Sequence, residues 1–304
     1  NDGKGGFKMD IATKIPQHAT LGMVTDATWA DLNADRYPEL VVTQDWGEIV
    51  VFENQQGKQL TPKMVEGTSG WWNRLKPADL DGDGDLDFVV GNLGRNTRLC
   101  ASEQTPVELY AKDVDNNSVH DTFINCAAED GVLYPFLLKT DLQKAIPSIK
   151  KKYIYFSDYG KKQLNEIFDK GELNDAVVRK VTQPNSGILL NEKGTLTFKA
   201  LPTQVQFSPI YGIETVDYDA DGKLDILLAG NFFDVLPEFG RYDANYGIVL
   251  RNQGQAAFAL VPPAQSGFMV RGQVRNMQKV RAKNGKPLFV LAKNSDKMQV
   301  FGLK

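Results

Sequence analysis

Histidine and cysteine, the residues on which many catalytic and zinc sites depend, are almost missing from this chain. Its 304 residues include two histidines, His18 and His120, and two cysteines, Cys100 and Cys126. Two thiolates alone are too few for a structural zinc site. The cysteines could form a disulfide in an oxidising compartment or stay reduced, and the sequence leaves both alternatives open. No G-x-S-x-G motif and no clear Ser-His-Asp set occurs, so the sequence favours a binding role over catalysis.

Long apolar runs and an excess of basic residues are missing as well. No run of about 18 apolar residues occurs, which is the length that a membrane-spanning helix needs. The formal net charge is −3, whereas domains that bind nucleic acid are usually basic. We therefore expect neither a transmembrane segment nor a nucleic-acid partner. The sequence has no initiator methionine and starts at Asn1 with a turn-like segment, so we expect a mature or excised part of a longer chain.

What the chain does have is material for a core and for turns. Hydrophobic residues make up 42% of it and aromatic residues 10%, and there are 27 glycines and 14 prolines. This composition is typical of many short strands that are joined by tight turns. Propellers built in this way hold a chain of this length in one domain, so the length alone does not require two domains.

A nine-residue acidic pattern occurs four times in the chain. Two strong copies begin at Asp79 and Asp217, and each is followed by an apolar run that ends in Gly-Asn. Two weaker copies begin at Asp31 and Asp113. Because the pattern recurs, it indicates a repeat architecture. The side chains at positions 1, 3, 5 and 9 of the four copies all carry oxygen: Asp31, Asn33, Asp35 and Glu39; Asp79, Asp81, Asp83 and Asp87; Asp113, Asp115, Asn117 and Asp121; and Asp217, Asp219, Asp221 and Asp225.

A second element recurs after the acidic pattern. It is a β-rich run followed by an Asn- and Gly-containing turn and an aromatic residue, as in residues 188–198 and 248–258. One full unit is then a four-stranded antiparallel sheet with an acidic hairpin loop, and such sheets must stack around an axis to bury both faces. We predict an all-β fold, a single β-propeller over residues 1–304 with about five blades visible. A ring of six or seven blades would need residues before Asn1.

Residues 137–183 interrupt the repeat. Thr140-Asp141-Leu142-Gln143 resembles a helix capping box, and Leu164, Ile167 and Phe168 follow helical spacing. We therefore predict a small helical insertion within the propeller.

The acidic loops predict bound calcium. Ca²⁺ takes six to eight oxygen ligands, and aspartates at alternate positions of a tight loop can supply them. An EF-hand is excluded, because it needs a Glu at position 12, where the strong copies have Val90 and Leu228 in apolar runs. Position 6 favours glycine, but the weaker copies have Arg36 and Ser118 there, so their occupancy is left open. We expect two to four Ca²⁺ ions.

The pattern D-x-D-x-D-G-x-x-D, followed by an apolar strand and Gly-Asn, resembles the FG-GAP or VCBS-type repeat. Such repeats form the propellers of integrin α-subunits and occur in many bacterial secreted proteins. The segments 230–247 and 266–275 also look like the final repeats of bacterial surface members of this kind. The resemblance implies calcium in the first hairpin of a blade and an extracellular, cell-surface or periplasmic location. The departures at Arg36, Asn117 and Ser118 put two of the sites in doubt.

Three functions remain open at this stage. The first is a calcium-binding adhesion or binding module for a protein or a glycan. The alternatives are a polysaccharide-active enzyme similar to lyases, for which we assign no catalytic residue, and a structural domain of a larger secreted protein. Loops that follow the second strand of a blade should converge on one face. They carry the candidate partner-binding residues Trp46, Asn92, Arg95, Asn231 and Arg241.

Overall fold

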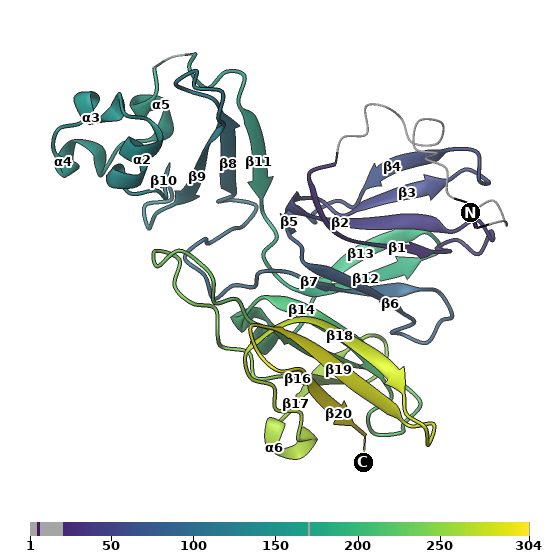
Figure 1. Cartoon of the computed structure of the whole chain (residues 1–304). Helices are drawn as coiled ribbons and strands as arrows, with labels where there is room; N and C mark the ends of the chain where they lie inside the picture. Colours follow the sequence, from purple (N-terminus) through teal and green to yellow (C-terminus); the bar gives the residue numbers. More distant parts are fainter. Residues whose placement is uncertain (1–4, 7–20, 170, 304) are drawn as a thin grey trace. The chain divides into compact units, whose positions relative to one another are not determined.

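The structure is a computed structural model that describes residues 5–6, 21–169 and 171–303 (Figure 1). The chain divides into two compact units. Unit 1 comprises Asn1–Thr97 and Asn185–Lys304, and unit 2 comprises Arg98–Pro184. Unit 2 therefore interrupts the sequence of unit 1.

Unit 1 contains four antiparallel sheets whose strands pair in chain order, except that β5 of the first sheet pairs with β2. Sheet I contains β1 (Met23–Ala30), β2 (Glu39–Gly47), β3 (Val50–Asn54), β4 (Leu60–Met64) and the short β5 (Gly70–Trp71). Sheet II contains β6 (Arg74–Ala78), β7 (Asp87–Gly91), β12 (Gly187–Glu192) and β13 (Thr195–Ala200). Sheet III contains β14 (Ile210–Val216), β15 (Asp225–Gly230), β16 (Ile248–Asn252) and β17 (Phe258–Val261). Sheet IV contains β18 (Gln273–Arg281), β19 (Pro287–Asn294) and β20 (Gln299–Gly302).

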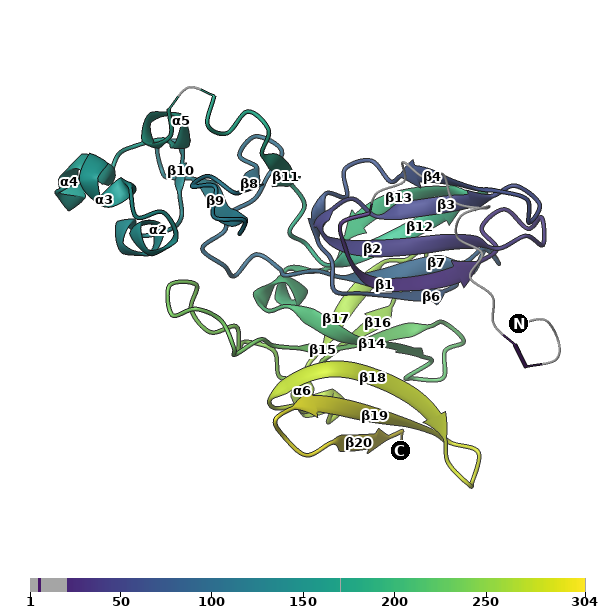
Figure 2. The same ribbon diagram turned by 45° about the horizontal axis from the view of Figure 1, so that its top comes forward.

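The four sheets of unit 1 stack one after another, as Figure 2 shows. Their first strands lie side by side, β1 against β6, β6 against β14, and β14 against β18. An apolar core fills the space between each pair of neighbouring sheets. Because the inner sheets are covered on both faces, β7 and β15 are buried at every residue. The arrangement is consistent with successive propeller-like blades.

The glycine of the Gly-Asn pair that ends β7 or β15 lets backbone approach closely. A Cβ atom added at Gly91 would lie 2.5 Å from the carbonyl oxygen of Ile210, at the start of sheet III. The next residue, Asn92, accepts the backbone N–H of Ile210 on its own carbonyl oxygen at 3.1 Å. Gly230 meets the backbone of Pro209, the residue before β14, inside sheet III. Gly91 is thus required by the contact between sheets II and III, and Gly230 by the close pairing of β14 with β15.

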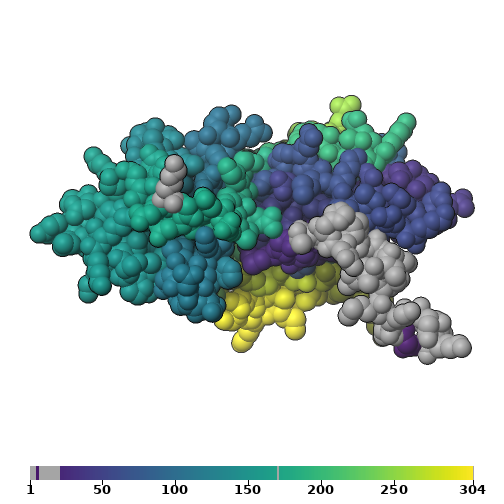
Figure 3. Space-filling view, turned by 90° about the horizontal axis from the view of Figure 1, so that it is seen from above, coloured from purple at the N-terminus to yellow at the C-terminus, as the bar shows by residue number. Residues whose placement is uncertain are grey.

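Unit 2 carries a sheet and a helical segment of its own. Its sheet has the order β10-β9-β8-β11, with β8 (Val107–Lys112), β9 (Asp121–Ala127), β10 (Leu133–Pro135) and β11 (Val177–Val181). The helices are α2 (Lys139–Ala145), α3 (Ile149–Lys152), α4 (Phe156–Tyr159) and α5 (Leu164–Ile167). They pack their apolar residues with Phe123 of β9 into one core. The surface of this unit is seen in teal in Figure 3.

The predicted all-β fold with four-stranded antiparallel sheets is confirmed. The short helices of unit 2 lie inside the range 137–183, and unit 1 adds η1 (Thr203–Phe207) and α6 (Pro263–Ser266). None of the helices that the structure describes is long and apolar enough to cross a membrane. A single propeller over residues 1–304 stays a prediction. Both Cys100 and Cys126 are thiols in the structure, and His18 lies outside the described residues.

Candidate metal-binding loops

Each of the four acidic loops joins the first two strands of its sheet, which pair antiparallel and form a hairpin. The loops, named here by their first residues, are the Asp31 loop (31–39) in sheet I, the Asp79 loop (79–87) in sheet II and the Asp217 loop (217–225) in sheet III. The Asp113 loop (113–121) occupies the same place in the sheet of unit 2. The position predicted from the sequence, the first hairpin of a sheet, is therefore the observed one.

All four loops share one backbone conformation. Positions 4 and 6 have a positive φ in every copy: Ala34 59°, Gly82 85°, Asn116 58° and Ala220 60° at position 4, and Arg36 73°, Gly84 96°, Ser118 68° and Gly222 86° at position 6. The sequence had predicted that a side chain at position 6 weakens the turn, yet Arg36 and Ser118 adopt it. The backbone N–H at position 6 donates a hydrogen bond to the side chain of the first aspartate, at 2.9 Å from Arg36 to Asp31. This bond offsets the cost of the left-handed backbone conformation, about 1–2 kcal/mol for a residue other than glycine.

The ninth residue anchors each loop to its sheet. Its carboxylate accepts the backbone N–H of position 2 at 2.7–3.2 Å in all four copies. It is also buried, with exposed fractions of 3% for Glu39, 0% for Asp87, 7% for Asp121 and 0% for Asp225. Burial raises the pKa of Asp87 and of Asp225 above the usual range, against the opposing effect of two backbone hydrogen bonds each. Position 9 therefore holds a desolvated carboxylate beside the others.

Three loops bring three carboxylates together. Positions 1, 3 and 9 of the Asp79, Asp113 and Asp217 loops each offer an oxygen atom within 4.8 Å of the other two. In the Asp31 loop position 3 is the amide Asn33 and position 9 is the longer Glu39, and no such carboxylate group forms there among the described residues. Position 5 stands outside these groups. The side chain of Asp83 accepts the N–H of Asp85 at 2.9 Å, and Asp35 makes the same bond to Tyr37 at 2.8 Å.

The oxygen groups fit a hard divalent cation. Carboxylates at such short separations repel one another unless a cation or a proton neutralises them. In the Asp79 loop, burial together with the charges of Asp83 and Asp79 raises the pKa of Asp81. The donors are all oxygens, the set that Ca²⁺ prefers, and they include no sulfur or nitrogen ligand for zinc. The carboxylates at positions 1, 3 and 9 would hold the ion, and its positive charge would neutralise their mutual repulsion.

Two buried asparagines connect the loops of neighbouring sheets. Asn191 of β12 donates its backbone N–H to Asp87 at 2.8 Å and its side-chain Nδ2 to the carbonyl of Leu32 in the Asp31 loop at 2.9 Å. The Asn-Gly turn was evident from the sequence, but no role was predicted for its asparagine. The signal was present, because an asparagine recurs four residues after the first residue of β3, β12 and β16.

Asn252 repeats this arrangement in the next sheet. Its backbone N–H binds Asp225 at 2.7 Å, and its Nδ2 binds the carbonyl of Leu80 in the Asp79 loop at 2.7 Å. Leu80 in turn donates its N–H to Asp87 at 2.8 Å. Together with Asn191, these bonds form a continuous buried path through the Asp217, Asp79 and Asp31 loops, which we call the asparagine relay.

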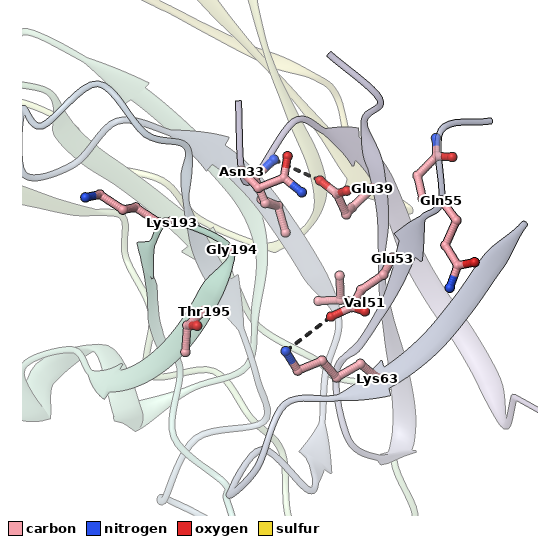
Figure 4. A pocket seen from close by; sticks show the side chains of 11 residues that line it. Asn33, Glu39, Val51, Glu53, Gln55, Lys63, Lys193, Gly194 and Thr195 are labelled. Atoms are coloured by element: carbon pink, nitrogen blue, oxygen red, sulfur yellow. Dashed lines mark hydrogen bonds and ion pairs between the residues drawn. The ribbon is translucent and has the colours of Figure 1, made fainter. Parts of the chain in front are cut away.

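A pocket opens beside the Asp31 loop, between sheets I and II (Figure 4). It has a volume of about 360 Å³. Asn33 and Glu39 line one side of it, Gly194 and Thr195 lie across from them, and Lys63 forms an ion pair with Glu53 at 3.2 Å. The Asp31 loop is thus accessible from a polar groove.

The five residues predicted to contact a partner have different surroundings. Asn92 and Asn231 are buried, with exposed fractions of 0% and 3%, and both bind backbone groups inside unit 1. Trp46 packs edge-on against buried Trp71, with ring centroids 5.4 Å apart. Arg95 is exposed, and its N–H binds the carbonyl of Gln206 at 2.7 Å. Arg241 is exposed and lines a second pocket, described below. Their role in partner binding stays a prediction.

Charged residues also link the first strands of the four sheets. Arg74 of β6 pairs with Asp26 of β1 at 3.4 Å and donates to the carbonyls of Tyr211 and Arg275 at 3.1 and 3.2 Å. The guanidinium of Arg275 lies 4.6 Å from the ring centroid of Tyr211. Nearby, burial raises the pKa of Asp45 to about 6. This polar network holds the four first strands in register with one another.

Comparisons with known proteins give one informative match. A comparison with curated proteins found no matching protein. Among solved structures, the crystal structure of BBS1N in complex with ARL6DN, soaked with mercury, matches 93% of this chain and 79% of that chain at 10% identity, with a TM-score of 0.24. A TM-score this low does not establish a shared fold. The profile of the FG-GAP-like repeat matches residues 31–90, which hold the Asp31 and Asp79 loops. The chain therefore contains FG-GAP-like repeat sequence over residues 31–90, and the predicted resemblance to the FG-GAP repeat family is confirmed there.

Proposed function

We propose that this chain is a calcium-binding β-propeller module that recognises a protein or glycan ligand in an extracellular, cell-surface or periplasmic setting. The observation that carries this proposal is the carboxylate geometry. Three loops with the same backbone each bring three carboxylates within 4.8 Å of one another.

The stacked sheets support the propeller part of the proposal. Sheets I to IV follow one another with an apolar core between each successive pair, as blades do. The role of the ion would be mechanical. A cation held at positions 1, 3 and 9 would join the hairpin to the buried ninth carboxylate, and the asparagine relay passes from that carboxylate to the next sheet.

The extracellular part of the proposal follows from the expected affinity. The three carboxylate groups are partly exposed, with one exposed residue in each. Sites of this kind suit calcium at millimolar concentration, as outside the cell. A module stiffened by calcium there would present the loops at the sheet ends to a ligand.

The test is a calcium titration of the metal-free protein. After dialysis against EDTA, we expect two to four Ca²⁺ ions to bind per chain, by elemental analysis and calorimetry, and the melting temperature to rise with calcium. Magnesium is the matched control, because it requires a smaller octahedral site and gives up its water reluctantly. Absence of both bound calcium and a change in melting temperature would refute the proposal.

A further inference from the structure

A second pocket lies in unit 1 where sheets III and IV meet. It has a volume of about 450 Å³. The segment between β15 and β16 contributes Asn231, Phe233, Arg241, Asp243 and Tyr246, and the turn before β18 contributes Arg271 and Gly272. None of these residues belongs to an acidic loop. The volume falls in the range of pockets that bind small ligands.

Buried hydrogen bonds fix the walls of this pocket. The side chain of Asn231 donates to the carbonyls of Asn245 and Gly272 at 2.7 and 3.1 Å, and its Oδ1 accepts the N–H of Asn245 at 2.9 Å. Asn231 has a positive φ of 84°, and its exposed fraction is 3%. The N–H of Val270 binds the carbonyl of Tyr246 at 2.8 Å. The two segments that line the pocket are therefore joined and held in place before any ligand arrives.

The charge in the pocket is positive and only partly neutralised. The guanidinium of Arg241 lies 3.7 Å from the ring centroid of Phe233, which fixes its plane. Its Nε is 3.7 Å from the carboxylate of Asp243, and both side chains are more than half exposed, so this ion pair is weak. Arg271 is exposed and makes no ion pair with any residue that the structure describes. Two arginines and one aspartate thus line the pocket, while Asp296 beside Gly272 is paired with Lys293.

An aromatic surface lies beside these charges. Tyr246 is 53% exposed although its backbone is fixed, so its ring is available to a ligand. A guanidinium binds a carboxylate through two parallel hydrogen bonds, and an exposed aromatic ring packs against the apolar C–H face of a sugar ring. The pocket thus offers guanidinium groups for the carboxylate of an acidic sugar and an aromatic ring for its apolar face.

We propose that this pocket binds the carboxylate of an acidic saccharide, with Arg241 and Arg271 on the carboxylate and Tyr246 against the ring. The inference rests on the proposed binding function and names a ligand class for it. An acidic peptide would offer the same carboxylate but no flat sugar face for Tyr246. The saccharide is therefore the ligand that uses all three side chains.

The test is calorimetry of the calcium-loaded chain with a galacturonic acid trisaccharide as the probe. Both solutions contain the same calcium concentration, and a blank titration into buffer subtracts the heat of calcium binding by the uronate itself. We expect binding by the wild-type chain and an affinity loss of about tenfold or more for Arg271→Gln and for Arg241→Gln. Tyr246→Ala should lower the affinity for the trisaccharide by a smaller factor than either arginine variant does. The matched control is Arg281→Gln, which removes the same charge from the other end of β18.

Two further probes separate the alternatives. A neutral galactose trisaccharide should bind at least tenfold more weakly than the uronate, because it lacks the carboxylate. Equal binding of a short glutamate peptide, with the same loss in Arg271→Gln, would overturn the saccharide assignment, and so would unchanged affinity in both arginine variants. The calcium-dependent melting temperature of Arg271→Gln is measured alongside. A normal calcium response without uronate binding would overturn this inference and leave the proposed calcium-binding function standing.

Discussion

The Asp79 and Asp217 loops have the same backbone but different charges around it. Both have aspartate at positions 1, 3, 5 and 9 and glycine at position 6. In the Asp217 loop, the Nζ atom of Lys223 lies 2.6 Å from a carboxylate oxygen of Asp221. A guanidinium nitrogen of Arg251 lies 3.8 Å from a carboxylate oxygen of Asp219. No such cation pairs with the Asp79 loop among the described residues, where position 7 is Asp85 instead of lysine.

This difference is visible in the pKa directions. At position 5 of the Asp217 loop, the hydrogen bond from Lys223 lowers the pKa of Asp221. At position 3 of the Asp79 loop, burial and neighbouring aspartates raise the pKa of Asp81. The ninth carboxylates, Asp87 and Asp225, have a raised pKa in both loops. The Asp217 loop carries part of its own counter-charge, and the Asp79 loop has none from an ion pair among the described residues. The motif thus sets the geometry of the loop, while the residues between its aspartates set how much of the negative charge is already balanced.

The largest expected effect follows from removing a whole site. Asp79→Asn with Asp81→Asn keeps oxygen acceptors for the loop N–H groups but removes two charges, so one calcium ion should be lost. At a calcium concentration of about 100 times Kd, stability should fall by about 3 kcal/mol relative to wild type. Elemental analysis and calcium-dependent melting measure both quantities.

The matched pair for this prediction is Asp217→Asn with Asp219→Asn. It should also remove one ion, but the remaining Asp79 loop should fill at a lower calcium concentration than the Asp217 loop does in the first variant. Equal midpoints in the two variants would contradict the comparison between the loops.

Asp45, a half-buried carboxylate outside the loops, separates the effect of desolvation on stability from the effect of calcium. The pKa of Asp45 is about 6 in the folded chain and 3.8 as the ordinary value. Its contribution to stability is complete below pH 3.8 and is lost as the pH rises through about 6. Asp45→Asn should therefore stabilise the protein by about 2–3 kcal/mol at pH 8 and have little effect near pH 4.

Calcium should leave this effect of Asp45→Asn unchanged. Urea denaturation at the two pH values, with calcium and with EDTA, gives the four free energies of unfolding. A stabilisation that is the same at pH 4 and pH 8 would show that charge burial is not its cause.

The asparagine relay predicts an effect of intermediate size. Asn252→Ala removes the buried bond from Nδ2 to the carbonyl of Leu80, which links the two compared loops, and it should destabilise the chain by about 2 kcal/mol. Asn54→Ala removes a bond of the same type, from Nδ2 to the carbonyl of Pro38 at 2.9 Å, but at the surface and within one sheet. It should change stability by less than about 1 kcal/mol. Similar losses in urea denaturation would mean that the link between sheets has no special weight.

The relay also marks the limit of what the sequence could reveal. The acidic pattern was local, so the hairpin and its place in the sheet could be predicted from spacing. The spacing predicted oxygen ligands at positions 1, 3, 5 and 9, and the structure brings those at positions 1, 3 and 9 together in three loops. The bond from Asn191 to Leu32 joins residues 159 apart in the chain, and no local pattern contains that distance. The positive φ of Arg36 is unusual for a residue other than glycine. Residue type alone does not predict it, because the stabilising bond of its N–H depends on the side chain of Asp31 in the same loop.

The division into two units does not follow from the repeat, because the repeat continues across it. The Asp113 loop has the same spacing as the other three, and it lies in unit 2. Its sheet lies in the chain between β7 and β12, which pair with each other. Such a pairing across an interruption is a long-range property, and strand patterns do not report it.

The smallest predicted effect tests the role of position 7. Lys223→Asp should increase the calcium affinity of the Asp217 loop, and Asp85→Lys should decrease that of the Asp79 loop, each by about two- to fivefold, because exposed ion pairs contribute about 0.2–1 kcal/mol. Each exchange is measured by calcium titration in the background that lacks the other loop's site. The changes should shrink at about 1 M salt, where the Debye length falls to about 3 Å. If the exchange left both affinities unchanged, the ligand geometry alone would set them, and the charge difference between the two loops would have no consequence for binding.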